Sequence, residues 1–347
     1  MKRLKIIIVM LMAAIIFTGC NKPANNQPYT EENPRAAENQ DAEGRPYSGA
    51  AASNYGIIIN EEDVVFIDAT GQETVITKNP KRVVVLQNSL LEIWDQAGGQ
   101  AVGRIEESQD QIVENAKSAE VVGSMAAPSL EKVLSLEPDL VIISSSNRPQ
   151  REMIPLLTQN NIQVINLYNE LLEDYYRTIR LFTAITGRED LYEDCINKIK
   201  KKVDKIVAQA PADKEYKAVI LFATANNITV RDSTTMVGEM LKDLNVANIS
   251  DSIEAGGDIR TFSLEKILVE DPDFIFVQTM GTDLEAISKR LKSEALDNPA
   301  WASLTAVKED RYIILPKELY LYKPNDRYPE AYENLAKIIY PEVFGEY

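Results

Sequence analysis

Short apolar runs alternate with amphipathic segments through the first half of the chain. The runs have the length and composition of buried strands, and the segments between them repeat apolar residues at helical spacing. The expected strands are residues 83–86, 140–143 and 163–167, and the expected helices are residues 89–97, 130–136 and 153–160. Strands that are apolar throughout are typical of a parallel sheet covered by helices on both faces. A hairpin of residues 64–67 and 74–77, with its turn at 68–71, is expected before them.

The alternation stops between residues 170 and 209, where two helical stretches are separated by Gly187. In the second stretch, apolar side chains recur at spacings of 4, 4, 4 and 3, at Leu191, Cys195, Ile199, Val203 and Ile206. This spacing predicts one face of a helix of about 20 residues, which would be about 30 Å long. Pro211 is expected to end it.

A second α/β pattern follows this helix. Its expected strands are residues 218–223, 274–278 and 312–315, and its expected helices are residues 236–244, 264–270, 283–293 and 330–339. We therefore predict an α/β protein of two Rossmann-like lobes joined by a single long α-helix. The expected boundaries are residues 54–169 for the N-terminal lobe, 170–210 for the helical connection and 211–347 for the C-terminal lobe.

The first twenty residues have the pattern of a lipoprotein signal peptide. Three cations precede an unbroken apolar run at residues 6–17, which is too short for a membrane span and fits the h-region of a secretory signal. Cys20 follows two small residues, as in a lipobox, so we expect it to carry the lipid that anchors the exported protein to the cell membrane. The alternative is an ordinary signal peptide with an incidental cysteine. Residues 21–53 are polar and proline-rich and are expected to form a disordered tether.

The composition excludes several classes of function. With 37 basic and 53 acidic residues the chain has a net charge of −16, whereas nucleic-acid binding needs a basic face. Histidine is absent, so neither a Ser-His-Asp mechanism nor imidazole ligation of zinc or copper can be assembled. Cys195 lies on the apolar stripe of the long helix and is expected to be a core residue. We predict a monomeric binding protein and not an enzyme, without a catalytic cofactor.

One pattern occurs twice, once in each expected lobe. Residues 129–142 read Ser-Leu-Glu-Lys-Val-Leu-Ser-Leu-Glu-Pro-Asp-Leu-Val-Ile, and residues 263–276 read Ser-Leu-Glu-Lys-Ile-Leu-Val-Glu-Asp-Pro-Asp-Phe-Ile-Phe. In each copy Ser is expected to cap a two-turn helix, Pro to end it and Asp to precede a buried strand. A single copy is a common αβ connection, but two copies about 134 residues apart favour a duplicated architecture.

With these copies, the chain resembles the solute-binding lipoproteins that deliver iron chelates, haem and corrinoids to ABC importers. The resemblance covers residues 64–344 and rests on the order and spacing of further blocks, at residues 82–93, 121–132 and 298–319. It implies a ligand crevice at the carboxyl ends of the strands. It also implies an importer permease, with its ATPase, as the partner.

The resemblance assigns two helix carboxylates to docking on the permease. Glu92 lies at the N-lobe position that pairs with a permease arginine, and Glu239 lies at the C-lobe counterpart. Each follows a strand, on a helix from which it could project at the top of its lobe. The alternative is that both are ordinary solvated carboxylates.

Loops that follow the expected strands supply the candidate ligand residues. Arginine and lysine would pair with ligand carboxylates, and tyrosine would stack on a flat ligand. The candidates are Asn88, Arg104, Met125, Arg148, Tyr168, Arg260, Met280, Tyr320, Tyr322, Lys323 and Arg327. The alternative for each is a solvated loop charge or a half-buried aromatic ring.

The resemblance places two methionines where haem-binding relatives hold iron. Met125 lies at the position of a methionine axial ligand, whereas Met280 lies where those relatives have a histidine. Two thioether ligands would favour ferrous iron. The alternative is that both side chains are pliable apolar contacts.

The function expected from these features is capture of an iron complex between the lobes and its delivery to an ABC importer. As the transported ligand, haem is slightly favoured over a ferric siderophore. A cobalamin or corrinoid binder of the same importer class is the alternative, and a surface lipoprotein without a transport role is a further one.

Overall fold

The computed structural model describes residues 55–107, 112–252, 263–281, 283–293 and 297–347. All of them belong to the structural unit of residues 33–347. The expected signal peptide, Cys20, the tether and Arg260 lie outside the described residues. Within the described ranges, no helix combines the length and the apolar character that crossing a membrane requires.

The N-terminal lobe is built on a five-stranded sheet. Its strands lie in the order β10-β9-β4-β5-β6, and every neighbouring pair is parallel. The strands are β4 (Val83–Val85), β5 (Gly103–Arg104), β6 (Glu120–Val121), β9 (Leu140–Ser144) and β10 (Gln163–Leu167). The helices are α2 (Asn88–Gln96), α3 (Leu130–Ser135), α4 (Arg148–Arg151) and α5 (Ile154–Gln159). All three residues of β4 and all five of β9 are buried, as their apolar sequences predict.

Two small antiparallel sheets accompany this lobe. The predicted hairpin is present as β2 (Asp63–Ile67) and β3 (Glu73–Thr77), and β1 (Ile58–Ile59) pairs with its outer edge. A second hairpin of β7 (Gly123–Ser124) and β8 (Ala127–Pro128) precedes α3. This hairpin was not predicted because its strands are only two residues long.

Two helices follow the N-terminal sheet, α6 (Leu172–Thr186) and α7 (Glu189–Gln209). Gly187 separates them in the left-handed conformation, with φ of 70°, which glycine adopts at little cost. The long helix has 21 residues, close to the predicted length. It buries Ile196, Ile199 and Val203, while Cys195 is only half-buried. The buried face is therefore rotated by one residue from the predicted stripe at its N-terminal end.

The C-terminal lobe is built on a second sheet with the order β12-β11-β14-β15. Strands β11 (Lys217–Ala223), β14 (Phe274–Thr279) and β15 (Tyr312–Ile314) are parallel, whereas β12 (Ile228–Arg231) is antiparallel to β11. The short strand β13 (Ala247–Asn248) also pairs with β11. The helices are α8 (Met236–Asp243), α9 (Leu264–Glu270), α10 (Leu284–Leu291), α11 (Thr305–Lys308), α12 (Lys317–Tyr320), α13 (Tyr328–Ile339) and α14 (Pro341–Phe344).

The duplicated motif folds in the same way in both lobes. Ser129 Oγ accepts a hydrogen bond from the backbone N–H of Lys132 at 3.3 Å, and Ser263 caps α9 with the equivalent bond. The aspartate of each copy ties the motif to another strand. Asp139 accepts from the backbone N–H of Arg82 at 3.0 Å, just before β4, and Asp273 accepts from that of Lys217 at 2.9 Å, in β11. These bonds explain why an aspartate precedes each buried strand.

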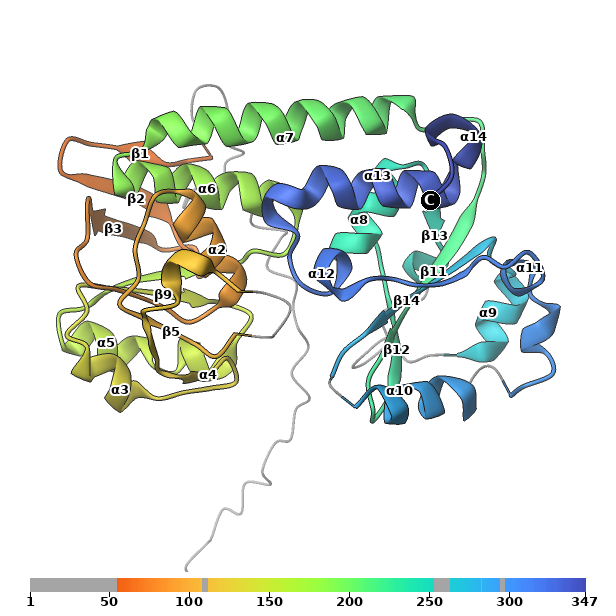
Figure 1. Cartoon of the computed structure of the whole chain (residues 1–347), viewed down its shortest axis with the longest axis horizontal. Helices are drawn as coiled ribbons and strands as arrows, with labels where there is room; N and C mark the ends of the chain where they lie inside the picture. The colour runs from red at the N-terminus through yellow and green to blue at the C-terminus, as the bar shows by residue number, and fades with distance from the viewer. Residues whose placement is uncertain (1–54, 108–111, 253–262, 282, 294–296) are drawn as a thin grey trace, which may run out of the picture. The chain divides into compact units, whose positions relative to one another are not determined.

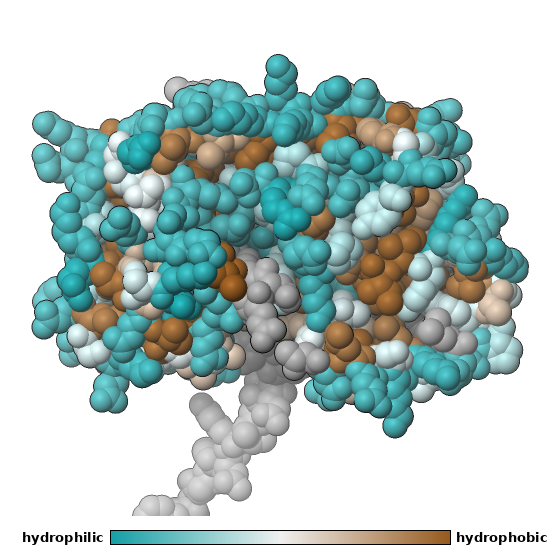
Figure 2. Space-filling view, in the orientation of Figure 1, coloured by the Kyte–Doolittle hydropathy of each residue, from teal (hydrophilic) through white to brown (hydrophobic). Residues whose placement is uncertain are grey.

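One hydrophobic core connects the two sheets. It contains Val85 from β4, Phe182 from α6 and Phe276 from β14. Helix α7 packs on both α6 and α13, so residues from both lobes meet along it (Figure 1). On the face shown in Figure 2, hydrophilic residues cover most of the surface and hydrophobic residues form separate patches. The structure thus has the two α/β sheets and the long helix that the apolar pattern predicts.

Candidate functional site

The loop after β9 lies at the carboxyl end of the N-terminal sheet, and the β7–β8 hairpin contacts it. Met125, at the tip of the hairpin, is 40% exposed. Its carbonyl oxygen accepts a hydrogen bond from Asn147 Nδ2 at 2.8 Å, which ties the hairpin to the start of α4. Arg148, the first residue of α4, pairs with Glu152 at 2.8 Å. Tyr168 is half-buried and follows β10 directly.

The corresponding edge of the C-terminal lobe begins where β14 ends. Met280 is 48% exposed, and its backbone N–H donates to the carbonyl of Ala223 at 2.9 Å. Lys317 Nζ donates to the carbonyl oxygen of Gly281 at 2.8 Å. The sequence prediction did not include this lysine, although a cation soon after the last strand was the signal that could have found it.

A pocket of about 120 Å³ lies between the lobes. Its lining comes from α2, from the segment before residue 114 and from the region of residues 318–327. The lining residues are Glu92, Ile112, Val113, Glu318, Tyr322, Lys323, Pro324 and Arg327. Three predicted ligand residues, Tyr322, Lys323 and Arg327, therefore meet here.

Each cation of this pocket is paired with a carboxylate. Lys323 Nζ lies 2.6 Å from Glu170 Oε2, and Arg327 Nε lies 2.8 Å from Glu330 Oε2. Arg327 makes a second contact to the other oxygen of Glu330 at 2.9 Å. The first pair joins the two lobes, because Glu170 follows β10 and Lys323 follows α12.

Glu170 is held by donors from both lobes. Besides Lys323, Ser146 Oγ donates to its Oε1 at 2.9 Å. Burial alone would raise the pKa of the Glu170 carboxyl, but the charge of Lys323 and the hydrogen bonds from Lys323 and Ser146 outweigh it. The pKa therefore lies below its usual value. Glu170 is ionised at neutral pH, and this region of the crevice contains a satisfied carboxylate.

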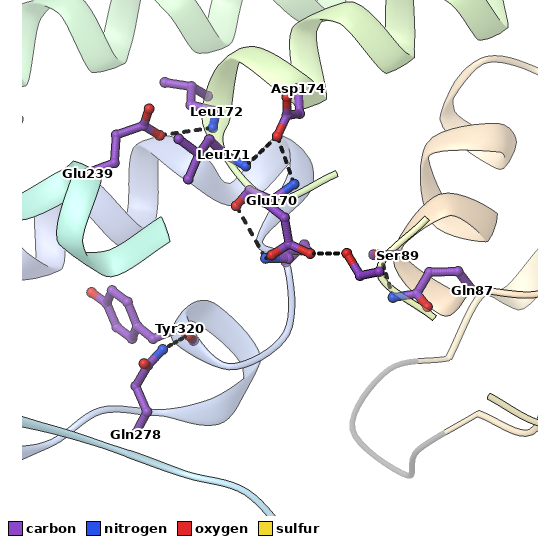
Figure 3. Close-up of polar contacts among 11 residues, drawn as sticks. Gln87, Ser89, Glu170, Leu171, Leu172, Asp174, Glu239, Gln278 and Tyr320 are labelled. Atoms are coloured by element: carbon purple, nitrogen blue, oxygen red, sulfur yellow. Dashed lines mark hydrogen bonds and ion pairs between the residues drawn. The ribbon is translucent and has the colours of Figure 1, made fainter. Parts of the chain in front are cut away.

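Two of the predicted ligand residues are structural. Tyr320 is 1% exposed and its hydroxyl donates to the carbonyl of Ala331 at 2.9 Å. Its own carbonyl accepts from Gln278 Nε2 (Figure 3). The prediction that Tyr320 stacks on a ligand is therefore wrong, because the residue lies in the core. Arg104 is mostly buried, where it donates to the carbonyl of Ala116 at 3.0 Å and pairs with Glu107 at 3.4 Å, so it belongs to the interior of its lobe.

Asn88 begins α2 and is half-buried. Its Nδ2 donates to the carbonyl of Glu106 at 3.2 Å, and its Oδ1 is buried without a partner among the described residues. The unpaired oxygen leaves Asn88 able to accept one further hydrogen bond.

The two predicted docking carboxylates are not exposed on the lobe surfaces. Glu92 is half-buried and accepts a hydrogen bond from Asn325 Nδ2 at 2.6 Å. Glu239 is also half-buried and accepts from the backbone N–H of Leu172 at 3.2 Å (Figure 3). Each carboxylate contacts the opposite lobe or the helix leading to it. Both side chains therefore have tertiary partners, and permease docking through them stays a prediction.

The family model for periplasmic binding proteins matches residues 83–319. The Fe(3+)-citrate-binding protein YfmC of Bacillus subtilis is 25% identical over 319 residues, covering 88% of this chain and 87% of YfmC. The uncharacterized ABC transporter substrate-binding lipoprotein YvrC of the same organism is 27% identical over 351 residues, covering 99% of both chains.

Among solved structures, the complex of Staphylococcus aureus SirA with staphyloferrin B is similar, with a TM-score of 0.63 at 24% identity. The likeness covers 80% of this chain and 98% of SirA. It confirms the α/β architecture with two lobes. Because the family model spans more than half of the chain, the chain belongs to the periplasmic binding protein family.

Proposed function

We propose that this protein captures an iron complex in the crevice between its lobes and delivers it to an ABC importer. The observation that carries the proposal is the pocket between the lobes, where Tyr322, Lys323 and Arg327 gather in a chain of net charge −16. Cations and a phenol ring suit an anionic chelate with planar or carboxylate groups. The name of YfmC and the ligand in the SirA structure support an oxygen-donor ferric chelate as the first candidate.

Haem is the second candidate ligand. Met125 and Met280 support it, because both side chains are exposed and each follows a strand of a different lobe, β7 or β14. A haem iron held by one or both thioethers would favour the ferrous state.

The proposal extends to the membrane and the importer. Cys20 would carry a lipid that holds the protein outside the cytoplasm, a reading that the lipoprotein name of YvrC supports. For the contact with the permease we propose Glu131 and Glu265, because both are exposed and each occupies the same position in one copy of the duplicated motif. Two equivalent carboxylates, one in each lobe, suit a permease that contacts both lobes.

Titration of the purified protein with ferric citrate and with haem tests the ligand. We expect ferric citrate to change the intrinsic tyrosine fluorescence, and Arg327→Met to weaken its binding about fivefold to tenfold, because a charged partner of the chelate is lost. Arg188→Met is the matched control. Arg188 also pairs with a carboxylate, Asp190 at 2.8 Å, but lies at the start of the long helix, away from the pocket, so affinity should not change.

A Soret shift on adding haem that disappears in Met125→Ala and Met280→Ala would instead assign haem as the ligand. Binding of neither iron complex would refute the proposed function.

A further inference from the structure

The carboxylate of Glu170 occupies a site with the properties of an anion-binding site. Lys323 Nζ at 2.6 Å and Ser146 Oγ at 2.9 Å approach its two oxygens from different lobes. Ser146 lies on the loop that follows β9, and Lys323 lines the pocket between the lobes. Any carboxylate of a bound ligand that reached this point would meet the same two donors.

Only the side chain of Glu170 would have to move for such an exchange. Its backbone N–H donates to Asp174 Oδ2 at 2.9 Å, and its carbonyl oxygen accepts from Lys323 Nζ at 3.2 Å (Figure 3). The main chain at this position is therefore held on both sides. The side chain of Glu170 is 47% exposed, so its carboxylate can rotate into solvent.

The ammonium group of Lys323, unlike the carboxylate of Glu170, cannot easily be left without a partner of opposite charge. Its side chain is only 17% exposed, and an ammonium group that is largely removed from water needs a compensating charge. A ligand oxygen with negative charge can replace Glu170 at this ammonium, whereas a neutral ligand cannot. Lys323 can therefore give up its contact with Glu170 only when a ligand with a negatively charged oxygen is bound.

We propose that Glu170 is an internal competitor that holds Ser146 and Lys323 until a carboxylate of the iron complex displaces it. The crevice then selects ferric chelates that carry a free carboxylate over neutral ones. This inference rests on the proposed function and names its ligand class. Ionisation of Glu170 at neutral pH, which its lowered pKa ensures, keeps the competitor charged.

Glu170→Gln tests the inference, because it keeps the shape of the side chain and removes its charge. We expect the variant to bind ferric citrate about twofold to fivefold more tightly than the unaltered protein, the gain from removing a partly exposed ion pair. Lys323→Met should weaken the same binding at least tenfold. Affinity for a neutral ferric trihydroxamate should stay weak, and Glu170→Gln should not improve it.

Asp204→Asn is the control, since it removes the partner of Lys200 at 3.3 Å on α7 and should leave every affinity unchanged. Thermal unfolding checks that each variant is folded. If Lys323→Met does not fold, Ser146→Ala is the milder substitution that replaces it. A Glu170→Gln variant that binds ferric citrate equally or more weakly would overturn the inference, as would an equal gain for the neutral chelate.

Iron-free citrate separates this inference from the proposed function. If the unaltered protein binds no iron complex, the proposed function fails, but the anion site can still be tested. Tighter citrate binding by Glu170→Gln would then support the site, and unchanged binding would exclude it.

Discussion

Glu92 shows how a single side chain can acquire a role that its place on a helix does not suggest. It is half-buried on α2 and accepts a hydrogen bond from Asn325, which also donates to the carbonyl of Ser89 at 3.1 Å. The pKa of the Glu92 carboxyl is raised to about 7, mainly by burial; Asp326 and Asp95 contribute to the rise, while Asn325 and Arg327 oppose it. Glu92 is thus a contact between the lobes whose charge changes near neutral pH.

Replacing Glu92 with Gln should make the stability of the protein less dependent on pH. The unfolded carboxyl ionises near pH 4.5 and the folded one near pH 7. The stability that the protonated group contributes is therefore complete below pH 4.5, falls as the pH rises and is lost above pH 7. We expect Glu92→Gln to match the unaltered protein at pH 4.5 and to be more stable at pH 8, by up to about 3 kcal/mol.

Denaturant unfolding of both proteins at these two pH values measures the difference. The Gln side chain can still accept a hydrogen bond from Asn325, so the two proteins differ in the ionisable group and not in this hydrogen bond. An equal free energy of unfolding at pH 8 would show that Glu92 is not held in the protonated form.

Helices α3 and α9 are the matching elements of the two lobes. Each is capped by a serine and tied to a strand by an aspartate, so its orientation on its sheet is determined by the same bonds. Each also presents an exposed glutamate in its first turn, Glu131 or Glu265. An exposed ion pair contributes little alone, so docking through these helices requires both.

Uptake of the iron complex by cells should therefore depend on Glu131 and Glu265 together. We expect each single Ala variant to reduce uptake modestly, and the double variant to reduce it about tenfold, since each exposed pair contributes up to about 1 kcal/mol. Ligand affinity of the purified variants should not change. The exposed carboxylates Glu193 and Asp204 of α7 provide a control pair. Full uptake by the double variant would contradict docking through α3 and α9.

The long helix limits how far the lobes can move. It packs on α6 and α13 over much of its length, and the core that it covers contains residues of both sheets. A lobe rotation would have to shear these contacts, because a helix resists bending more than an extended crossover segment does. The molecule is therefore expected to respond to its ligand with a small rotation and not with a wide closure.

Solution scattering of the purified protein with and without ferric citrate measures this response. We expect the two scattering curves to superimpose. Lys201→Pro should break α7 at an exposed position, lower stability by about 3 kcal/mol and change the curve. Lys201→Ala should do neither. A large ligand-induced change in the unaltered protein would contradict the rigid connection.

The kinds of element along the chain could be predicted because burial leaves a local pattern. Strands β4 and β9 are apolar at every position, and α7 repeats its apolar residues at helical spacing, so neighbouring residues suffice to identify them. All expected strands and helices occur, with ends displaced by two residues at most. The antiparallel strand β12 and the β7–β8 hairpin were missed, because short strands carry little periodic signal.

Local pattern also indicated the crevice edges, because loops after parallel strands meet at one end of a sheet. It could not distinguish a crevice side chain that is available to a ligand from one that is already paired with another residue of the protein. Glu92 and Asn325 are 233 residues apart in the chain, and Glu170 and Lys323 are 153 apart. The burial of Tyr320, the inward turn of Glu92 and the ion pair of Lys323 each depend on a partner that only folding brings near. Residue type and spacing therefore specified the two lobes and their connection, while packing between distant segments decided which polar groups of the crevice a ligand can reach.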